Sequence, residues 1–174
     1  IGGNTGQAIA AAVRADRAVC KRCRFLGHQD TLFADYGRQY YVDSYIEGGV
    51  DFIFGNATAV FDRTEIRANG PGYLTAQSRT SPDQTTGYVI VNSKVTSGIE
   101  PGAPRDTISL GRPWRPYARV VYIDTELPAN VIPEGWNTWG NRDKTPMAYF
   151  AEYKSTGPGA NASARAPWTH QLTA

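Results

Sequence analysis

Two aspartates, Asp30 and Asp51, carry the strongest chemical signal in this chain of 174 residues. They lie 21 positions apart, and the residues around them recur at the same spacing. Two carboxylates held within about 5 Å cannot both ionise easily, so one pKa rises and the other falls. That division yields an acid and a nucleophile or base. The alternative interpretation is that both are corner residues that cap turns, as Asp often does.

Three other residues suit chemistry beside such a pair. Arg112 is a candidate orienter, because an Arg fork keeps one carboxylate ionised. Gln29 directly precedes Asp30 and could donate its amide to a developing oxyanion, although on its own it is more simply explained as an ordinary exposed turn Gln. Trp114 could stack on a sugar ring; the alternative is a core Trp, but the adjacent Pro makes burial in a strand less natural.

The two aspartates can act together only if the fold brings residues 21 apart side by side, and the surrounding repeat indicates how. Residues of similar type recur at this offset: Arg17 and Arg38, Cys20 and Tyr41, Cys23 and Ser44, Phe25 and Ile46, Gly27 and Gly48, Asp30 and Asp51. A third line follows at a slightly shorter step, and a looser fourth occupies residues 87–95. A period near 20 residues is typical of a solenoid. Stacked strands would then place equivalent positions roughly 4.8 Å apart.

Each repeat reads as a short apolar strand, a glycine corner and a second short strand, such as 31–33 and 52–54. Glycine permits the corner geometry, and strands that return in the same direction form parallel sheets. We also expect strands at 73–76 and 118–123. From Leu127 the period is lost, and we expect an irregular tail along the outside of the solenoid or over its end.

Length, composition and charge limit the function classes. The chain is long enough for one domain, residues 1–174, with a sizeable core. The composition is that of a globular protein, with 41% hydrophobic and 20% charged residues. A net charge of +2 is too small to argue for nucleic acid, though it would not repel an acidic polymer. No apolar run approaches a membrane span. No phosphate-binding loop or metal-ligand cluster is evident, so we expect no cofactor and no metal.

The cysteines Cys20 and Cys23 form a C-x-x-C pattern, which can be a redox pair or half of a zinc site. The zinc interpretation lacks a second pair of ligands. Residues three apart on a strand point to opposite faces, which disfavours a disulfide. We therefore expect two buried free thiols.

Several segments of the chain resemble the pectin methylesterases. Segments 29–32 (QDTL), 49–57 (GVDFIFGNA) and 110–114 (LGRPW) look like the three signature motifs of that family. Segments 6–10, 73–77 and 168–172 also fit the family pattern. The resemblance covers nearly the whole chain, and its motifs are specific.

The resemblance implies an all-β, right-handed parallel β-helix that removes methyl groups from homogalacturonan (pectin) and releases methanol. It also implies a secreted, monomeric enzyme of the cell wall, with no nucleic acid or membrane partner. Carried over residue by residue, the implied roles are nucleophile for Asp51, general acid and base for Asp30, oxyanion stabiliser for Gln29, second donor and substrate contact for Gln7, support of the nucleophile for Arg112, and sugar stacking for Trp114.

The sequence departs from the family in extent, because the first family motif, Gly-x-Tyr-x-Glu, is missing. We therefore expect a domain fragment truncated at both ends, with incomplete N-terminal coils. Two alternatives remain. A close Asp pair also suits a retaining polysaccharide hydrolase on a similar solenoid. A non-catalytic pectin-binding solenoid would keep the platform without the activity.

Overall fold

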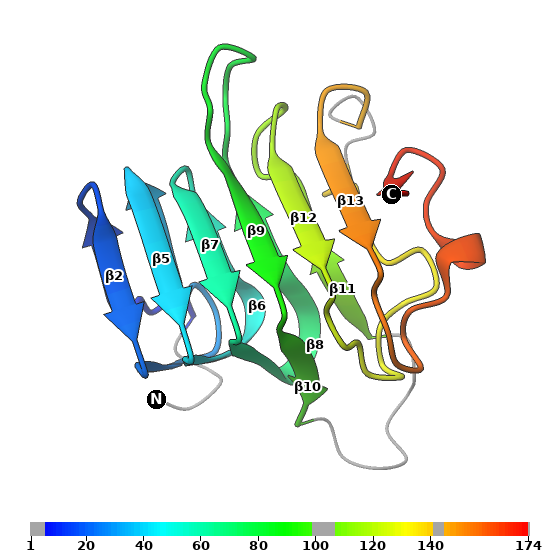
Figure 1. The fold of residues 1–174 in the computed structure, drawn as a ribbon, viewed down its shortest axis with the longest axis horizontal. Helices are drawn as coiled ribbons and strands as arrows, with labels where there is room; N and C mark the ends of the chain where they lie inside the picture. Colours follow the sequence, from blue (N-terminus) through cyan, green and yellow to red (C-terminus); the bar gives the residue numbers. More distant parts are fainter. Residues whose placement is uncertain (1–5, 99–106, 141–144, 174) are drawn as a thin grey trace.

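The computed structural model describes residues 6–98, 107–140 and 145–173, and their backbone is almost entirely strand and turn. The strands form two parallel sheets whose neighbours are one coil apart in the chain. The described part contains one short 3-10 helix, η2 (Ala162–Ala164). This arrangement is a parallel β-helix, and the coils advance from the blue N-terminal end to the red C-terminal end (Figure 1).

The first sheet lies across the front of the molecule in Figure 1. Its strands, in spatial order, are β14 (His170–Gln171), β13 (Tyr149–Tyr153), β12 (Arg119–Ile123), β9 (Gly87–Val91), β7 (Thr58–Asp62), β5 (Arg38–Val42) and β2 (Ala18–Lys21). Most of these strands alternate buried and more exposed residues, as expected when one face covers a core.

The second sheet contains two long, bent strands. Its strands are β1 (Ala11–Arg14), β4 (Leu32–Tyr36), β6 (Tyr45–Gly55), β8 (Glu65–Gln77) and β10 (Lys94–Ser97), with β3 (Arg24–Leu26) paired to β6 and β11 (Ile108–Gly111) paired to β8. The pairing of β6 with β8 shifts register between Gly48 and Val50 and again between Val50 and Ile53. The strand therefore turns a corner there, and this corner carries the candidate site.

The register confirms the predicted repeat. Phe25 pairs with Ile46 and Leu32 pairs with Ile53, both at the 21-residue step. In the next coil Tyr41 pairs with Phe61, which is the predicted shorter step. Equivalent apolar residues consequently stack along the axis, and the rings of Tyr41 and Phe61 lie 4.8 Å apart between centroids. The core is a set of such ladders, buried from water by the coils above and below.

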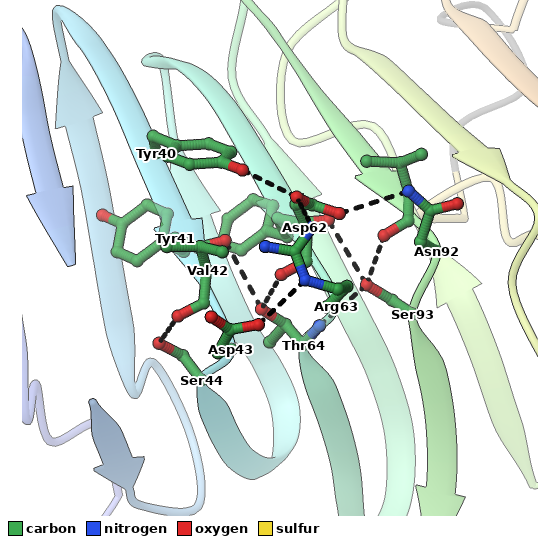
Figure 2. Close-up of polar contacts among 12 residues, drawn as sticks. Tyr40, Tyr41, Val42, Asp43, Ser44, Asp62, Arg63, Thr64, Asn92 and Ser93 are labelled. Carbon is green, nitrogen blue, oxygen red and sulfur yellow. Dashed lines mark hydrogen bonds and ion pairs between the residues drawn. The ribbon is translucent and has the colours of Figure 1, made fainter. Parts of the chain in front are cut away.

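A second corner repeats where strands of the first sheet end, and Figure 2 shows it at Ser44, Thr64 and Ser93. Four of these corners pair a residue of positive φ with a following Ser or Thr whose hydroxyl is hydrogen-bonded: Asp43–Ser44, Arg63–Thr64, Asn92–Ser93 and Asp124–Thr125. Each hydroxyl donates to the carbonyl oxygen two residues earlier, for example Ser93 Oγ to Val91 at 2.7 Å. We call these eight residues the Ser/Thr corner. Side chains in this corner and just before it are also linked, since Asp62 accepts hydrogen bonds from Tyr40 and Asn92.

Residues beyond Leu127 correct part of the prediction for the tail. They contain little regular strand, but they still wind in register with the preceding coils. Ile108 bridges Val131 and Gly111 bridges Trp136, and further on β13 and β14 extend the first sheet. This segment therefore adds coils to the solenoid, where we expected it to lie outside them. The period is hidden because the connecting turns differ in length.

The cysteines also differ from the prediction. Cys20 and Cys23 are free thiols, but both are only half-buried. They do not point to opposite faces, because Arg22 between them has φ of +56° and turns the chain. The straight-strand assumption was wrong at this corner, since Cys23 occupies the position that Ser44 has in the next coil and its amide donates to Ser44 Oγ.

No helix in the residues that the structure describes is long and apolar enough to span a bilayer.

Candidate active site

Asp30 and Asp51 occupy equivalent corners of two adjacent coils. The residues before them, Gln29 and Val50, form a parallel bridge, and the amide of Asp30 donates to the carbonyl oxygen of Val50 at 3.1 Å. Both aspartates have a left-handed backbone, with φ of +62° and +50°. Asp tolerates this region better than most residues, and such conformations cluster at functional sites. The fold thus brings the two carboxylates into one place, as the repeat predicted.

The acidic column ends after these two coils. In the next coil Val50 pairs with Tyr73 and Ile53 pairs with Thr75, so Leu74 is the one residue opposite both Asp51 and Phe52. Leu74 is fully buried and apolar. At this position the third coil therefore contributes an apolar core residue where the two preceding coils contribute carboxylates.

Arg112 reaches Asp51 from two coils further along the solenoid, past the coil that contains Leu74. It follows β11, and its amide donates to the carbonyl oxygen of Thr75 at 3.0 Å. Its Nε donates to Asp51 Oδ1 at 2.9 Å and its Nη2 donates to Oδ2 at 2.6 Å. This bidentate fork fixes the plane of the carboxylate as well as its charge. The predicted contact between Arg112 and one member of the pair is confirmed.

The two carboxyl groups titrate differently because their neighbours differ. Burial and the charge of Asp51 raise the pKa of Asp30 to about 6, against a weaker opposing effect of Arg112. Burial also raises the pKa of Asp51, which is 5% exposed, and the hydrogen bonds and charge of Arg112 act against that rise. The prediction that one pKa rises is confirmed for Asp30. The prediction that the other falls is wrong for Asp51, because desolvation outweighs the guanidinium.

The two glutamines lie beside the aspartates. Gln7 forms a parallel bridge with Gln29, and the amide of Ala8 donates to the carbonyl oxygen of Gln29 at 3.1 Å. Gln7 is exposed and Gln29 is half-buried. The three coils therefore present Gln7, Gln29 and Val50 in a row, with Asp30 and Asp51 following the last two.

These side chains line one cavity of about 170 Å³. Its lining residues are Gln7, Gln29, Asp30, Asp51, Phe54, Ala76, Arg112, Trp114 and Trp139. Trp114 is half-exposed at the rim, 6.1 Å from Phe54 between ring centroids, and the guanidinium of Arg115 lies over it. All six residues singled out from the sequence therefore meet in one place. Within the described ranges, no cluster of three or more His, Cys, Asp or Glu is placed to hold a metal ion.

Comparison with known proteins assigns the family. A family model described as Pectinesterase matches residues 1–173. The chain belongs to the pectinesterase family. Pectinesterase 31 of Arabidopsis thaliana is 45% identical over 97% of this chain, which corresponds to 52% of the plant protein. This pectinesterase chain thus spans about half the length of that relative.

Solved structures agree with the assignment. Pectin methylesterase from carrot superposes with a TM-score of 0.91 at 35% identity, covering 96% of this chain and 55% of the carrot chain. A pectin methylesterase in complex with a hexasaccharide gives a TM-score of 0.75 at 31% identity, covering 91% of this chain and 53% of that one. The predicted right-handed parallel β-helix of the pectinesterases is thereby confirmed.

Two aromatic residues of this candidate site are not evident from the sequence. Trp139 and Tyr73 lie over the guanidinium of Arg112, and neither was assigned a role. Tyr73 stood out only as part of an expected strand, and Trp139 lies in the segment where the repeat is lost. A single sequence gives little signal for such contacts, because both rings come from coils whose spacing differs from 21 residues.

Proposed function

We propose that this chain carries the catalytic site of a carboxylic ester hydrolase that demethylates homogalacturonan, converting pectin and water to pectate and methanol. The single observation that carries the proposal is the asymmetric aspartate pair, in which Arg112 forks Asp51 while Asp30 stands free of that fork with its pKa at about 6. A nucleophile must hold its charge, and a general acid must hold a proton near working pH.

In the first half-reaction Asp51 attacks the carbonyl carbon of the methyl ester. The amides of Gln29 and Gln7 stabilise the resulting oxyanion. The bond to the methoxy oxygen then breaks, and Asp30 gives its proton to that oxygen, so methanol leaves and an acyl-enzyme anhydride remains. The apolar cavity wall at Phe54 and Ala76 supports this step by restricting water near Asp51.

In the second half-reaction Asp30, now ionised, accepts a proton from water. The hydroxide that forms attacks the acyl carbon and releases Asp51, which returns to its fork with Arg112. The product is a galacturonate carboxyl group, and both aspartates regain their starting protonation states. None of these steps needs a metal or a cofactor.

Several features support the substrate class. Trp114 is half-exposed at the rim of the cavity that holds the carboxylates, and aromatic rings suit sugar rings. A slightly basic chain, at +2, does not repel a polymer that becomes acidic as it is demethylated. Membership of the pectinesterase family supports pectin as the polymer. We place the enzyme outside the cell, at cell walls, acting as a monomer.

The test is methanol release from methylated pectin by the full-length protein, with chain length of the polymer followed in parallel. We expect methanol without shortening of the chains. Shorter chains without methanol would favour a retaining polysaccharide hydrolase, and binding without either product would favour a pectin-binding solenoid. Either result would reject the proposal.

A further inference from the structure

The guanidinium of Arg112 is stacked on both faces. Its Cζ lies 3.7 Å from the ring centroid of Tyr73 and 3.6 Å from that of Trp139. Both distances are well inside the roughly 6 Å at which a cation is attracted to an aromatic face. The Arg112 side chain is only 17% exposed, so neither contact is a loose surface one.

The two rings come from different coils on either side of Arg112. Tyr73 belongs to β8, where it pairs with Val50 on one side and Ser109 on the other. Trp139 lies three residues after Trp136, which forms a bridge with Gly111 of β11. The rings therefore approach the guanidinium from opposite directions along the axis, as a clamp would.

Trp139 is held in a costly backbone conformation. Its φ is +61°, which is uncommon for a bulky side chain, and its amide donates to Asn137 Oδ1 at 2.8 Å. Residues kept in this region persist only where the surroundings enforce them, often at functional sites. The indole lies over Arg112 in this conformation, which indicates that the fold enforces the contact.

We infer that Tyr73 and Trp139 are positioning residues, which clamp the guanidinium of Arg112 so that its Nε–Nη2 edge stays turned toward Asp51. A guanidinium is planar, so stacking on both faces leaves only its edges for hydrogen bonding. The clamp removes the rotations that would break the bidentate fork. Asp51 is thereby kept charged and aimed, although burial favours its neutral form.

The sign of the effect on Asp51 follows from the groups around it. The charged groups that act on this carboxyl in the described part of the chain are Asp30 in the preceding coil and Arg112. If the clamp is loosened, the contribution of Arg112 weakens and the pKa of Asp51 rises. Tyr73 does not line the cavity that holds Asp51, so its removal does not enlarge that cavity directly. Trp139 does line that cavity, so its loss also admits water, which partly opposes the rise.

Titration of Asp51 in the full-length protein tests the clamp directly. Carboxyl NMR of labelled aspartate, in an Asp30→Asn background that removes the coupled titration, would compare Tyr73→Leu and Trp139→Leu with their parent. We expect the pKa of Asp51 to rise by at least about half a unit in Tyr73→Leu, and Tyr73→Phe to restore most of the parent value. The matched control is Tyr45→Leu, which removes a ring stacked on Arg24 at 4.2 Å outside the site. An unchanged titration in both Leu variants would overturn the inference.

Kinetics link the clamp to catalysis, and only this link depends on the proposed function. The acid limb of the kcat/KM profile should move to higher pH in Tyr73→Leu, with kcat reduced about tenfold or more. If Trp139→Leu raises KM but leaves the acid limb of the profile unmoved, Trp139 is a substrate contact and not a positioning residue. If the parent releases no methanol, the proposed function fails, yet the NMR titration still decides whether the clamp acts on Asp51.

Discussion

At the scale of single residues, two identical side chains differ because their surroundings differ. Asp30 is half-buried beside a second carboxylate, and Asp51 is nearly fully buried but forked by Arg112. The surroundings of Asp30 favour a proton on it. At Asp51 the fork of Arg112 favours the charged form and opposes the effect of burial. The chemistry proposed for each follows from this contrast.

Asp51→Asn should lower methanol release by at least about a thousandfold, because the amide is not a nucleophile. Asp30→Asn should lower it by about 10²- to 10⁴-fold, through loss of the general acid and base. Initial rates on methylated pectin measure both. Asp83→Asn, in an exposed loop, is the matched control and should retain the parent rate. Near-normal activity in folded Asp51→Asn would exclude this residue as the nucleophile.

Asp30 should also limit stability as the pH rises. Its folded pKa of about 6 exceeds the ordinary value of 3.8, so the folded state binds the proton more tightly. Its stabilising contribution is complete below pH 3.8 and is lost as pH rises through about 6. Asn imitates the protonated form, so Asp30→Asn should raise Tm by about 3 °C at pH 7.5 and leave it unchanged near pH 4. Thermal melts at both values measure this, and an equal Tm at pH 7.5 would contradict it.

The sequence predicts some residue-level features and not others. The 21-residue register was enough to place Asp30 beside Asp51, because strand stacking converts sequence spacing into distance. The direction of the Asp51 pKa was not predictable, since it depends on how deeply the fold buries this carboxyl group. The ring of Trp139 was hidden for a related reason, because its contact with Arg112 depends on an irregular turn.

At the scale of elements, the Ser/Thr corner defined above holds successive coils together. Ser93 Oγ accepts a hydrogen bond from the amide of Thr64 at 3.0 Å and donates to Val91 at 2.7 Å. It thus joins two coils at a position where both residues are buried. The backbone groups of a solenoid corner cannot all pair within the sheets, and these hydroxyls take their place.

Ser93→Ala should therefore destabilise the protein by about 1–3 kcal/mol, because the buried amide of Thr64 loses its partner. Urea unfolding followed by circular dichroism measures the change. Ser163→Ala, in the exposed helix η2, is the control and should change stability by less than about 0.5 kcal/mol. Similar changes in unfolding free energy for both variants would show that the buried Ser93 hydroxyl contributes no more than an exposed one.

The elements themselves could largely be predicted from sequence. The paired strands around 25–54 follow from the repeat, and the bend in β6 follows from Gly48 and Gly49. The coil between Val131 and Trp136 could not be predicted, because it makes only isolated bridges to β11. Without a strand-length run of alternating residues, the sequence carries no period to detect.

At the scale of the whole molecule, a buried ion pair attaches the C-terminal segment to the coils. Arg165 Nε donates to Glu152 Oε1 at 2.6 Å, and the two side chains are 3% and 2% exposed. Arg165 also donates to the carbonyl oxygens of Gly159 and Pro133. One guanidinium thus connects β13 with two separate turns.

Glu152→Ala should destabilise the protein by about 3–5 kcal/mol, because it leaves Arg165 buried without its carboxylate. Denaturant unfolding measures this loss. Asp35→Ala, which removes the exposed pair with Arg14, should cost no more than about 1 kcal/mol. A loss of that small size in Glu152→Ala would show that water reaches Arg165 freely.

The order in which the site residues enter along the axis restricts how such a chain can lengthen during evolution. Six site residues come from successive coils, in the order Gln7, Asp30, Asp51, Tyr73, Arg112 and Trp139, and Arg112 must reach back past one coil to Asp51. Duplicating a whole coil before Gln7 or after Trp139 would leave these distances intact. Duplicating one between Asp51 and Arg112 would separate the guanidinium from its carboxylate by another strand spacing of roughly 4.8 Å, beyond the span of the fork. Gene-level growth of this solenoid should therefore be confined to its two ends.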